Sequence, residues 1–234
     1  MIPLRDDITS SRPPIITIGL IVANIGIYAL QILTGTGLET WAWKFGLVPY
    51  ELTHRAELTP HLGAPVGLTL FTSMFLHGGF FHLAGNMLYL WIFGDNVEDR
   101  LGHVRFLIFY LLCGVGAALS FALTSPDLQV PLVGASGAIA GVLGAYLLSY
   151  PGARIGTLIF FGFFVRIIYV PALVVLGLWF VIQVMSGLPT VGSSAQTGGV
   201  AFLAHVGGFL IGMALIVPLS PRHWRRGPGP GARI

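Results

Sequence analysis

The sequence predicts an all-α membrane protein in which six transmembrane helices cross the bilayer and both termini lie in the cytoplasm. Three observations carry this prediction: the composition, six long apolar runs and an uneven distribution of arginine. Hydrophobic residues make up 55% of the 234 residues and charged residues 9%, whereas roughly 25% of the residues in a soluble domain are charged. This composition excludes a disordered chain, a soluble globular enzyme and nucleic-acid binding through a basic surface.

The six apolar runs are each close to the roughly 20 residues that a helix needs to cross a bilayer. They lie at about residues 15–34, 78–94, 104–123, 133–150, 165–185 and 200–219. The second run is almost uninterrupted from residue 67 to residue 94, which is too long for one helix without strong tilt. We therefore expect residues 68–77 to dip into the membrane and the helix to start near Gly78 and Gly79.

The arginine distribution predicts the orientation, because Lys and Arg accumulate in cytoplasmic connections. With six helices, both termini and the connections at 95–103 and 151–164 share one side of the membrane. That side, with the adjoining helix ends, carries Arg5, Arg12, Arg100, Arg105, Arg154, Arg166, Arg222, Arg225, Arg226 and Arg233. The other side carries Lys44 and Arg55. Both termini are therefore expected in the cytoplasm, and the minimal six-helix form favours a prokaryotic plasma membrane.

The chain divides into three predicted parts. Residues 1–14 form a polar cytoplasmic segment, residues 15–219 form the six-helix domain, and residues 220–234 form a disordered basic tail in the cytoplasm. The sequence contains a single cysteine, Cys113, which excludes an internal disulfide and a cysteine-based zinc site.

A few polar side chains interrupt the apolar runs, and they are the candidates for a functional site. They are His77, His82, Asn86, Ser136 and His205. Each costs free energy in hydrocarbon unless it finds a partner or a water-filled cavity. Asp and Glu are absent from the six runs, apart from Asp95 at the edge of the second, which argues against a proton relay or an ion pump.

His82 and Asn86 are four residues apart, so they share one face of the second helix. Such a pair is often used for hydrogen bonds between helices. Ser136 begins a stripe of small residues, and stripes of this kind let helix backbones pack closely. The residues of this stripe are Gly137, Ala140, Gly141 and Gly144. Packing alone would therefore account for each of these two features.

His205 changes this interpretation, because it shares a face of the sixth helix with Gly208 and Gly212. If the two small-residue stripes pack together, Ser136 and His205 meet near the external end of the bundle. His82 and Asn86 reach a similar depth on the second helix. Independent packing roles would not require this agreement in depth.

At these residues the chain resembles the rhomboid family of intramembrane serine proteases. The matching segments are His82-Leu83-Ala84-Gly85-Asn86, Gly134-Ala135-Ser136-Gly137 and Ala204-His205-Val206-Gly207-Gly208, with residues 72–78 and 98–102 also similar to family sequence. Each motif alone is weak, but the ordered set, from about residue 70 to 212, is highly specific. The resemblance implies a six-transmembrane-helix rhomboid-like bundle.

The resemblance also implies the role of each site residue. Ser136 would be the nucleophile and His205 its general base, while His82, Asn86 and the Ser136 backbone N–H would form the oxyanion hole. The family uses this dyad without a carboxylate, which agrees with the absence of Asp and Glu from the apolar runs. The expected partners are single-pass transmembrane substrates and the lipid bilayer, with no metal, cofactor or nucleic acid.

The sequence departs from the family at two places. The Trp-Arg pair often found in the first external loop region is not present, and the residue four after the nucleophile, often an aromatic that packs under the histidine, is Ala140. We expect Gly78, Gly79, residues 68–77 and the loop at 186–199 to form the rim of the active-site cavity. By analogy with the family, the helix at 166–185 or the loop at 186–199 opens to admit a substrate.

Three other functions compete with the protease. A transporter or channel would explain the short fourth run as a broken helix, but no second broken segment or membrane carboxylate accompanies it. A metalloprotease could use His77, His82 and His205, but the sequence has no His-Glu-x-x-His motif. A non-catalytic rhomboid-like chaperone or binding protein is the main alternative, although such relatives have typically lost the Ser or the His, and both are present here.

Overall fold

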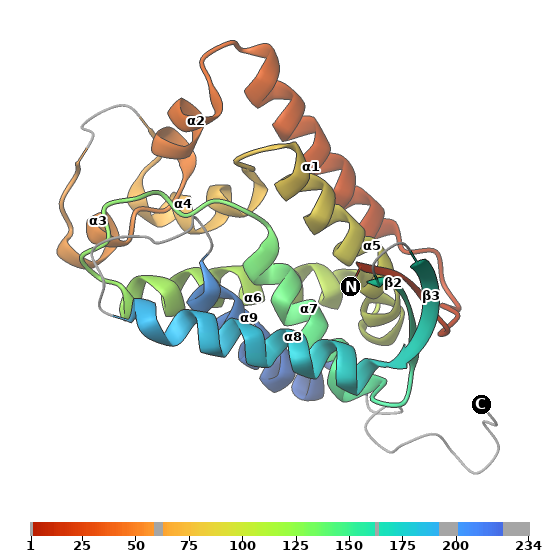
Figure 1. Ribbon diagram of the computed structural model, residues 1–234. Coiled ribbons are helices and arrows are strands. Elements are labelled where there is room, and N and C mark those ends of the chain that lie inside the picture. The colour runs from red at the N-terminus through yellow and green to blue at the C-terminus, as the bar shows by residue number, and fades with distance from the viewer. Residues whose placement is uncertain (1, 59–62, 162–163, 192–200, 222–234) are drawn as a thin grey trace.

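The computed structural model describes residues 2–58, 63–161, 164–191 and 201–221. These residues fold into a helical bundle with a small sheet at one end and a group of short helices at the other (Figure 1). The long helices are α1 (Ile15–Leu33), α5 (Phe80–Leu101), α6 (His103–Thr124), α7 (Ser136–Ser149), α8 (Ala172–Gly187) and α9 (Phe202–Leu219). Each of them overlaps one of the six apolar runs in the sequence.

The short helices lie between α1 and α5 and after α8. They are α2 (Leu38–Phe45), α3 (Pro49–His54), α4 (Val66–Thr72) and the 3-10 turns η1 (Ser73–Phe75) and η2 (Leu188–Thr190). Together, α4 and η1 make an angle of 81° with α5. The long helix therefore begins close to the predicted Gly78 and Gly79, after a separate short helical segment, and the membrane dip of residues 68–77 stays a prediction.

Four helices in the described part of the chain are long and apolar enough to cross a membrane: α1, α6, α9, and α8 together with η2. The bent pair of α4–η1 and α5 is a fifth candidate. Helix α7 has 14 residues, so it is about 21 Å long, which is less than the ~30 Å hydrocarbon core. The chain is an integral membrane protein, and six complete spans stay a prediction.

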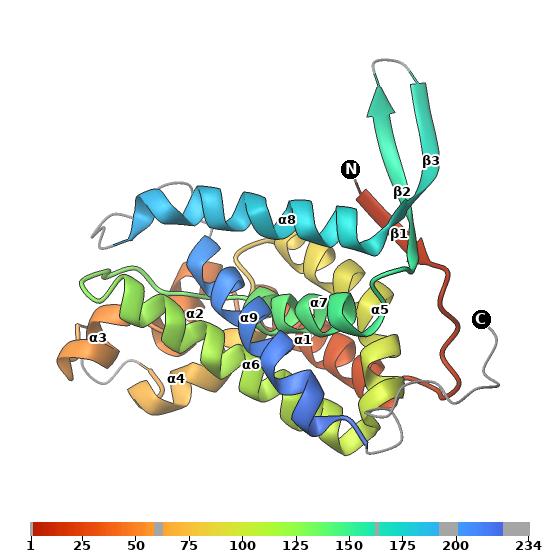
Figure 2. The same ribbon diagram turned by 90° about the horizontal axis from the view of Figure 1, so that it is seen from below.

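Helix α7 lies at the centre of the bundle, where it packs against α5, α6 and α9 (Figure 2). Its residues from Gly137 to Tyr146 are all buried. The sequence allows this position because the helix consists largely of glycine, alanine and aliphatic residues and so has no polar face that needs water.

Helices α7 and α9 approach each other through their glycines. A Cβ atom placed on Gly212 would lie 2.5 Å from the carbonyl carbon of Gly141, and one on Gly208 would lie 3.0 Å from that of Gly137. These separations leave no room for a side chain. The close backbone approach brings the start of α7 next to the first turns of α9.

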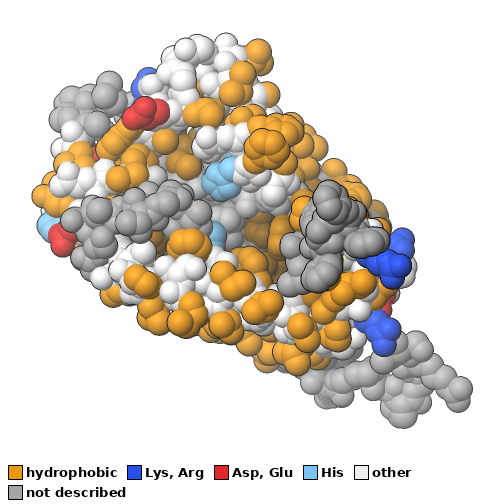
Figure 3. All heavy atoms as spheres, viewed as in Figure 1, with side chains coloured by type: hydrophobic (Ala, Val, Ile, Leu, Met, Phe, Trp, Pro, Cys, Tyr) orange, Lys and Arg blue, Asp and Glu red, His pale blue; other side chains and the backbone are white. Residues whose placement is uncertain are grey.

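The outer surfaces of α1 and α8 are hydrophobic. Large aliphatic side chains are exposed along both helices, for example Val22 on α1 at 63% and Met185 on α8 at 64%. Hydrophobic side chains cover most of the face in Figure 3, and the few charged ones lie toward its two ends. Such a surface is expected where helices contact lipid rather than water.

A three-stranded antiparallel sheet is added to the helical fold that the sequence predicts. Its strands, in the order β1-β2-β3, are β1 (Ile2–Asp6), β2 (Arg154–Phe161) and β3 (Phe164–Pro171). The hairpin of β2 and β3 projects from the bundle (Figure 2). The helix start predicted near residue 165 is wrong, because α8 begins at Ala172. Residues 165–170 are β-branched or aromatic except for Arg166, which favours a strand, and Pro171 disfavours helical geometry at the residue before it.

The N-terminal segment is fastened to the end of α5. Glu98, which is 1% exposed, accepts hydrogen bonds from the backbone N–H of Ile16 at 2.9 Å and of Thr17 at 2.7 Å. The first N–H groups of a helix have no partner within it, so this carboxylate stabilises the start of α1. Asp6 in β1 accepts hydrogen bonds from Tyr146 and Asn96, which connects the sheet to the bundle.

Candidate active site

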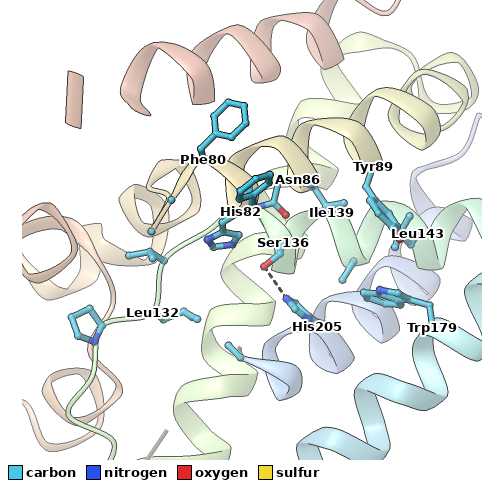
Figure 4. A pocket seen from close by; sticks show the side chains of 18 residues that line it. Phe80, His82, Asn86, Tyr89, Leu132, Ser136, Ile139, Leu143, Trp179 and His205 are labelled. Carbon is cyan, nitrogen blue, oxygen red and sulfur yellow. Dashed lines mark hydrogen bonds between the residues drawn. The ribbon is translucent and has the colours of Figure 1, made fainter. Parts of the chain in front are cut away.

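Ser136 and His205 come from different helices and are in hydrogen-bond contact. The Nε2 atom of His205 lies 2.8 Å from the Oγ atom of Ser136 (Figure 4). Ser136 is the first residue of α7 and His205 lies one turn into α9. The glycine contact between these helices therefore places the hydroxyl and the imidazole within reach of each other.

The loop before α7 brings Ser136 next to His82. Gly134 has φ +128°, a conformation that L side chains rarely adopt, and its N–H donates to the Ser73 carbonyl at 2.9 Å. A Cβ atom on Gly134 would lie 2.8 Å from His82 Nε2 and 3.6 Å from Ser136 Oγ. Only glycine fits here, so this position allows His82 to lie close to the loop that leads into Ser136.

Asn86 lies one turn beyond His82 on α5 and is 8% exposed. Its Nδ2 atom is 3.0 Å from Nε2 of His77. The rings of His77 and His82 are in edge contact, with centroids 5.1 Å apart. His77 is itself fully buried and does not line the cavity, so it supports the site from behind rather than at its entrance.

One cavity of about 700 Å³ is lined by all four predicted site residues, Ser136, His205, His82 and Asn86. Its walls are formed by α5, α7, α8, α9 and the loop before α7 (Figure 4). Among the described residues, none of the side chains that line the cavity is Asp, Glu, Lys or Arg. The polar side chains that line the cavity are those of Ser136, His82, His205, Asn86, Tyr89 and Trp179. None of them has a charged partner in the described walls.

The rim differs from the predicted one. Gly78 and Gly79 line the cavity, as do Phe80 and Phe81 at the start of α5. Residues 68–77 and 186–191 are not among the lining residues, because the 81° bend turns α4 away from the cavity. The rest of the predicted rim loop, residues 192–199, lies outside the described residues.

The small residues on α7 and α9 that were predicted to pack the helices together lie either at helix contacts or at the cavity wall. Gly137, Gly141, Gly208 and Gly212 face the opposing helix backbone or the side chains of α6, and Gly144 faces the backbone of Phe209 in α9. Ala140 is fully buried and also lines the cavity.

Two residues from α8 contact His205, and neither was predicted from the sequence. The ring centroid of Trp179 is 5.9 Å from that of His205, and Gln183 Oε1 lies 2.8 Å from His205 Nδ1. Trp179 of α8 thus places an aromatic ring against His205, whereas Ala140, four residues after Ser136, has no ring to place there. A signal was present in the sequence, since Gln183 is an amide in an apolar run, four residues after a tryptophan.

The described residues contain no group of three or more His, Cys, Asp or Glu side chains placed to hold a metal ion. The arrangement instead provides a hydroxyl, a base within hydrogen-bond distance of it, and neighbouring N–H donors. Those are the parts needed for acyl transfer through a serine nucleophile.

Comparison with known proteins gives matches to one family. Residues 66–222 match the Rhomboid domain. Rhomboid protein 1, mitochondrial, of Saccharomyces cerevisiae is 28% identical over 208 residues, which cover 87% of this chain and 53% of that protein. RHOMBOID-like protein 5 of Arabidopsis thaliana is 35% identical over 149 residues, which cover 63% of this chain and 44% of that protein.

A shorter match carries the name of an enzyme. Rhomboid protease GluP of Bacillus subtilis is 46% identical over 78 residues, which cover 33% of this chain and 15% of that protein. The chain thus spans about half or less of the length of these three relatives. The Rhomboid match and the name of GluP support intramembrane proteolysis at the level of the family.

Proposed function

Because the chain belongs to the rhomboid family, we propose that it is an intramembrane serine endopeptidase that cleaves transmembrane-helix substrates near the outer membrane boundary. The observation that carries this proposal is the 2.8 Å separation of Ser136 Oγ and His205 Nε2 inside a cavity shared with His82 and Asn86.

The dyad supplies the nucleophile and the proton transfers. As Ser136 Oγ attacks the scissile carbonyl carbon, His205 Nε2 takes the hydroxyl proton. The protonated imidazole then gives this proton to the leaving amine nitrogen, and the C–N bond breaks to leave an acyl-enzyme. A water molecule, deprotonated by the same nitrogen, then attacks the acyl carbon. The protonated imidazole returns this proton to Ser136 Oγ as the C–Oγ bond breaks, which releases the carboxylic acid product and restores the Ser136 hydroxyl.

The oxyanion of each tetrahedral intermediate needs fixed N–H donors. Asn86 Nδ2 and the ring of His82 can donate from α5. The backbone N–H of Ser136 is a third donor, because the first N–H groups of a helix have no partner within it. The positive end of the α7 dipole adds to the stabilisation of negative charge at this point.

A transmembrane substrate must unwind before it is cut, because its backbone groups are hydrogen-bonded within its own helix. Small or helix-breaking residues near the scissile bond would lower the cost of this step. Helix α8 is the proposed gate, since it forms one wall of the cavity and its outer face is hydrophobic.

The proposed placement has six spans, with both termini in the cytoplasm and the cavity open toward the opposite side. The distribution of arginine supports this orientation. One relative is named as mitochondrial, another is named as chloroplastic, and GluP is from Bacillus subtilis. These names favour no single membrane, so the prokaryotic plasma membrane stays a prediction from the sequence.

A fluorophosphonate probe on the detergent-purified protein tests the proposal. Wild type should be labelled covalently, and the Ser136→Ala and His205→Ala variants should not. Labelling that survives in Ser136→Ala would overturn the nucleophile assignment. Absence of labelling and of proteolysis in correctly folded wild type would favour the alternative, a non-catalytic rhomboid-like chaperone or binding protein.

A further inference from the structure

Gln183 is a buried amide on a helix that is otherwise almost entirely hydrophobic. Within α8 the buried residues are Ala172, Leu176, Gln183 and Gly187. Their spacings of four, seven and four residues place them on one narrow stripe. Gln183 therefore lies on the face by which α8 packs against the rest of the bundle.

The contact of Gln183 determines which nitrogen of His205 carries the proton. The amide oxygen Oε1 lies 2.8 Å from His205 Nδ1, and this oxygen can only accept a hydrogen bond. The proton of the neutral ring must then be on Nδ1, which leaves the lone pair on Nε2. That lone pair faces Ser136 Oγ at 2.8 Å, so Nε2 accepts from the hydroxyl, as a general base must.

In the serine–histidine–aspartate arrangement of soluble enzymes, a carboxylate selects this tautomer and stabilises the imidazolium that forms. The described walls of this cavity contain no carboxylate. Resting on the proposed function, we propose that Gln183 is a positioning residue that holds His205 in the Nδ1-protonated tautomer. An amide oxygen performs the orienting part of the task without placing a charge in the membrane.

This assignment links the packing of α8 to the reactivity of Ser136. Trp179, one turn before Gln183, packs on the ring of His205 with centroids 5.9 Å apart. If α8 moves away from α9, Trp179 and Gln183 both lose their contacts with the imidazole of His205. Displacement of α8 therefore exposes the cavity and releases His205 at the same time, and its return restores the reactive tautomer.

A pair of variants separates positioning from packing. Gln183→Met keeps the length of the side chain but removes the strong acceptor, whereas Gln183→Glu restores one. We expect Gln183→Met to lower kcat about 10–100-fold, by analogy with the loss of an orienting partner of a metal-ligating histidine, with KM little changed. Met185→Leu, a conservative change on the exposed side of the same helix, is the control and should behave as wild type.

The pH dependence of Gln183→Glu provides a second readout that a purely structural role would not change. The new carboxylate stabilises the imidazolium, so the acidic limb of the rate profile should move to higher pH by about 1 unit or more. Activity at neutral pH should lie closer to wild type than that of Gln183→Met.

A spectroscopic readout does not depend on activity. In ¹⁵N-histidine-labelled protein, with the His205 signals identified by their loss in His205→Ala, the wild-type shifts should report a protonated Nδ1. Gln183→Met should show a mixture of tautomers. The inference is overturned if Gln183→Met keeps the wild-type shifts, kcat and pH profile, and in that case labelling of Ser136 would leave the proposed function intact. If wild type itself fails to react, the proposed function fails, whereas the tautomer measurement still decides the role of Gln183.

Discussion

At the scale of single residues, two side chains of the site, Asn86 and His205, each contact one neighbouring residue and keep a second hydrogen-bonding group for the proposed reaction. Asn86 contacts His77 Nε2 through Nδ2 at 3.0 Å, and a side-chain amide nitrogen carries two hydrogens. One of them is used for this contact and the other remains for a substrate oxygen. The same principle applies to His205, whose Nδ1 is occupied by Gln183 while Nε2 faces Ser136.

The first prediction concerns Asn86. Asn86→Ala should lower kcat by about 10²–10³, because one donor to the oxyanion is lost, while KM changes little. Steady-state cleavage of a transmembrane substrate in detergent measures both constants. Asn24→Ala is the matched control, since Asn24 is also a buried asparagine but donates to Leu20 within its own helix. Equal losses of kcat in the two variants would contradict the role of Asn86.

At the scale of the elements, the most important contact is the one between α7 and α9, because it joins the two halves of the dyad. The contact depends on glycine at Gly141, Gly208 and Gly212, where backbone meets backbone. The small-residue stripes in the sequence allowed this pairing to be predicted, and with it the meeting of Ser136 and His205.

Gly212→Ala tests this contact. The added Cβ atom would lie 2.5 Å from the carbonyl carbon of Gly141, so the helices must separate, at a cost of about 1–3 kcal/mol or more. We expect a lower midpoint of thermal unfolding together with weaker fluorophosphonate labelling. Gly19→Ala in α1 is the control, because no atom lies within 4 Å of the position that its Cβ would occupy. A Gly212→Ala protein as stable and reactive as wild type would refute the account of this contact.

The sheet and Gln183 mark the limit of what the sequence could predict. Residues 165–170 belong to a long apolar run, and hydropathy alone does not distinguish a strand from a buried helix. The pairing of β2 with β1 is a contact across most of the chain, so no local pattern indicated it. The isolated amide of Gln183 is visible in the apolar run, but a single amide gives no periodic pattern, and its partner His205 lies on another helix.

The attachment of strand β1 to strand β2 and to the helical bundle, here called its docking, should depend on pH. Burial raises the pKa of Asp6 to about 6; the hydrogen bond from Tyr146 opposes this rise and the nearby Asp95 adds to it. The docked state therefore favours protonated Asp6. This contribution to docking is fully present below the ordinary carboxyl pKa of about 4 and is lost as the pH rises through the raised pKa.

Hydrogen exchange of the β1 amides, corrected for the intrinsic pH dependence, measures this effect. Protection should be greater at pH 4 than at pH 7 in wild type, and Asp6→Asn should remove the difference. The control is Asp7→Asn, which changes the neighbouring carboxylate that accepts a hydrogen bond from the Arg154 N–H. This variant should keep the difference in protection between pH 4 and pH 7. The same pH dependence in Asp6→Asn as in wild type would show that another group is responsible.

At the scale of the whole molecule, the fold keeps the proposed hydrolytic site apart from the surfaces that are expected to contact lipid. Polar groups gather in one cavity of about 700 Å³ at the junction of five elements, while α1 and α8 present aliphatic side chains outward. Helix α8 belongs to both regions, since its outer face is hydrophobic and its inner stripe contacts His205. Access of a substrate from the lipid and readiness of the dyad are therefore expected to depend on the same helix.

Restraining α8 tests this expectation. A reducible bis-maleimide crosslink between one cysteine introduced on α5 and one introduced on α8, across the cavity that both helices line, should block cleavage of a transmembrane substrate. Labelling by a small fluorophosphonate should continue, because the dyad stays assembled. The native Cys113 is buried and should not react. Reduction of the crosslink should restore cleavage, and full cleavage by the crosslinked protein would exclude α8 as the gate.

The most direct test of the account is proteolysis in liposomes that contain the purified protein and a single-pass substrate. Wild type should cut the substrate near its outer membrane boundary, and Ser136→Ala and His205→Ala should each abolish the cut while retaining the wild-type melting midpoint to within a few degrees. Cleavage at the same bond by Ser136→Ala would contradict the central claim that Ser136 and His205 form the catalytic unit.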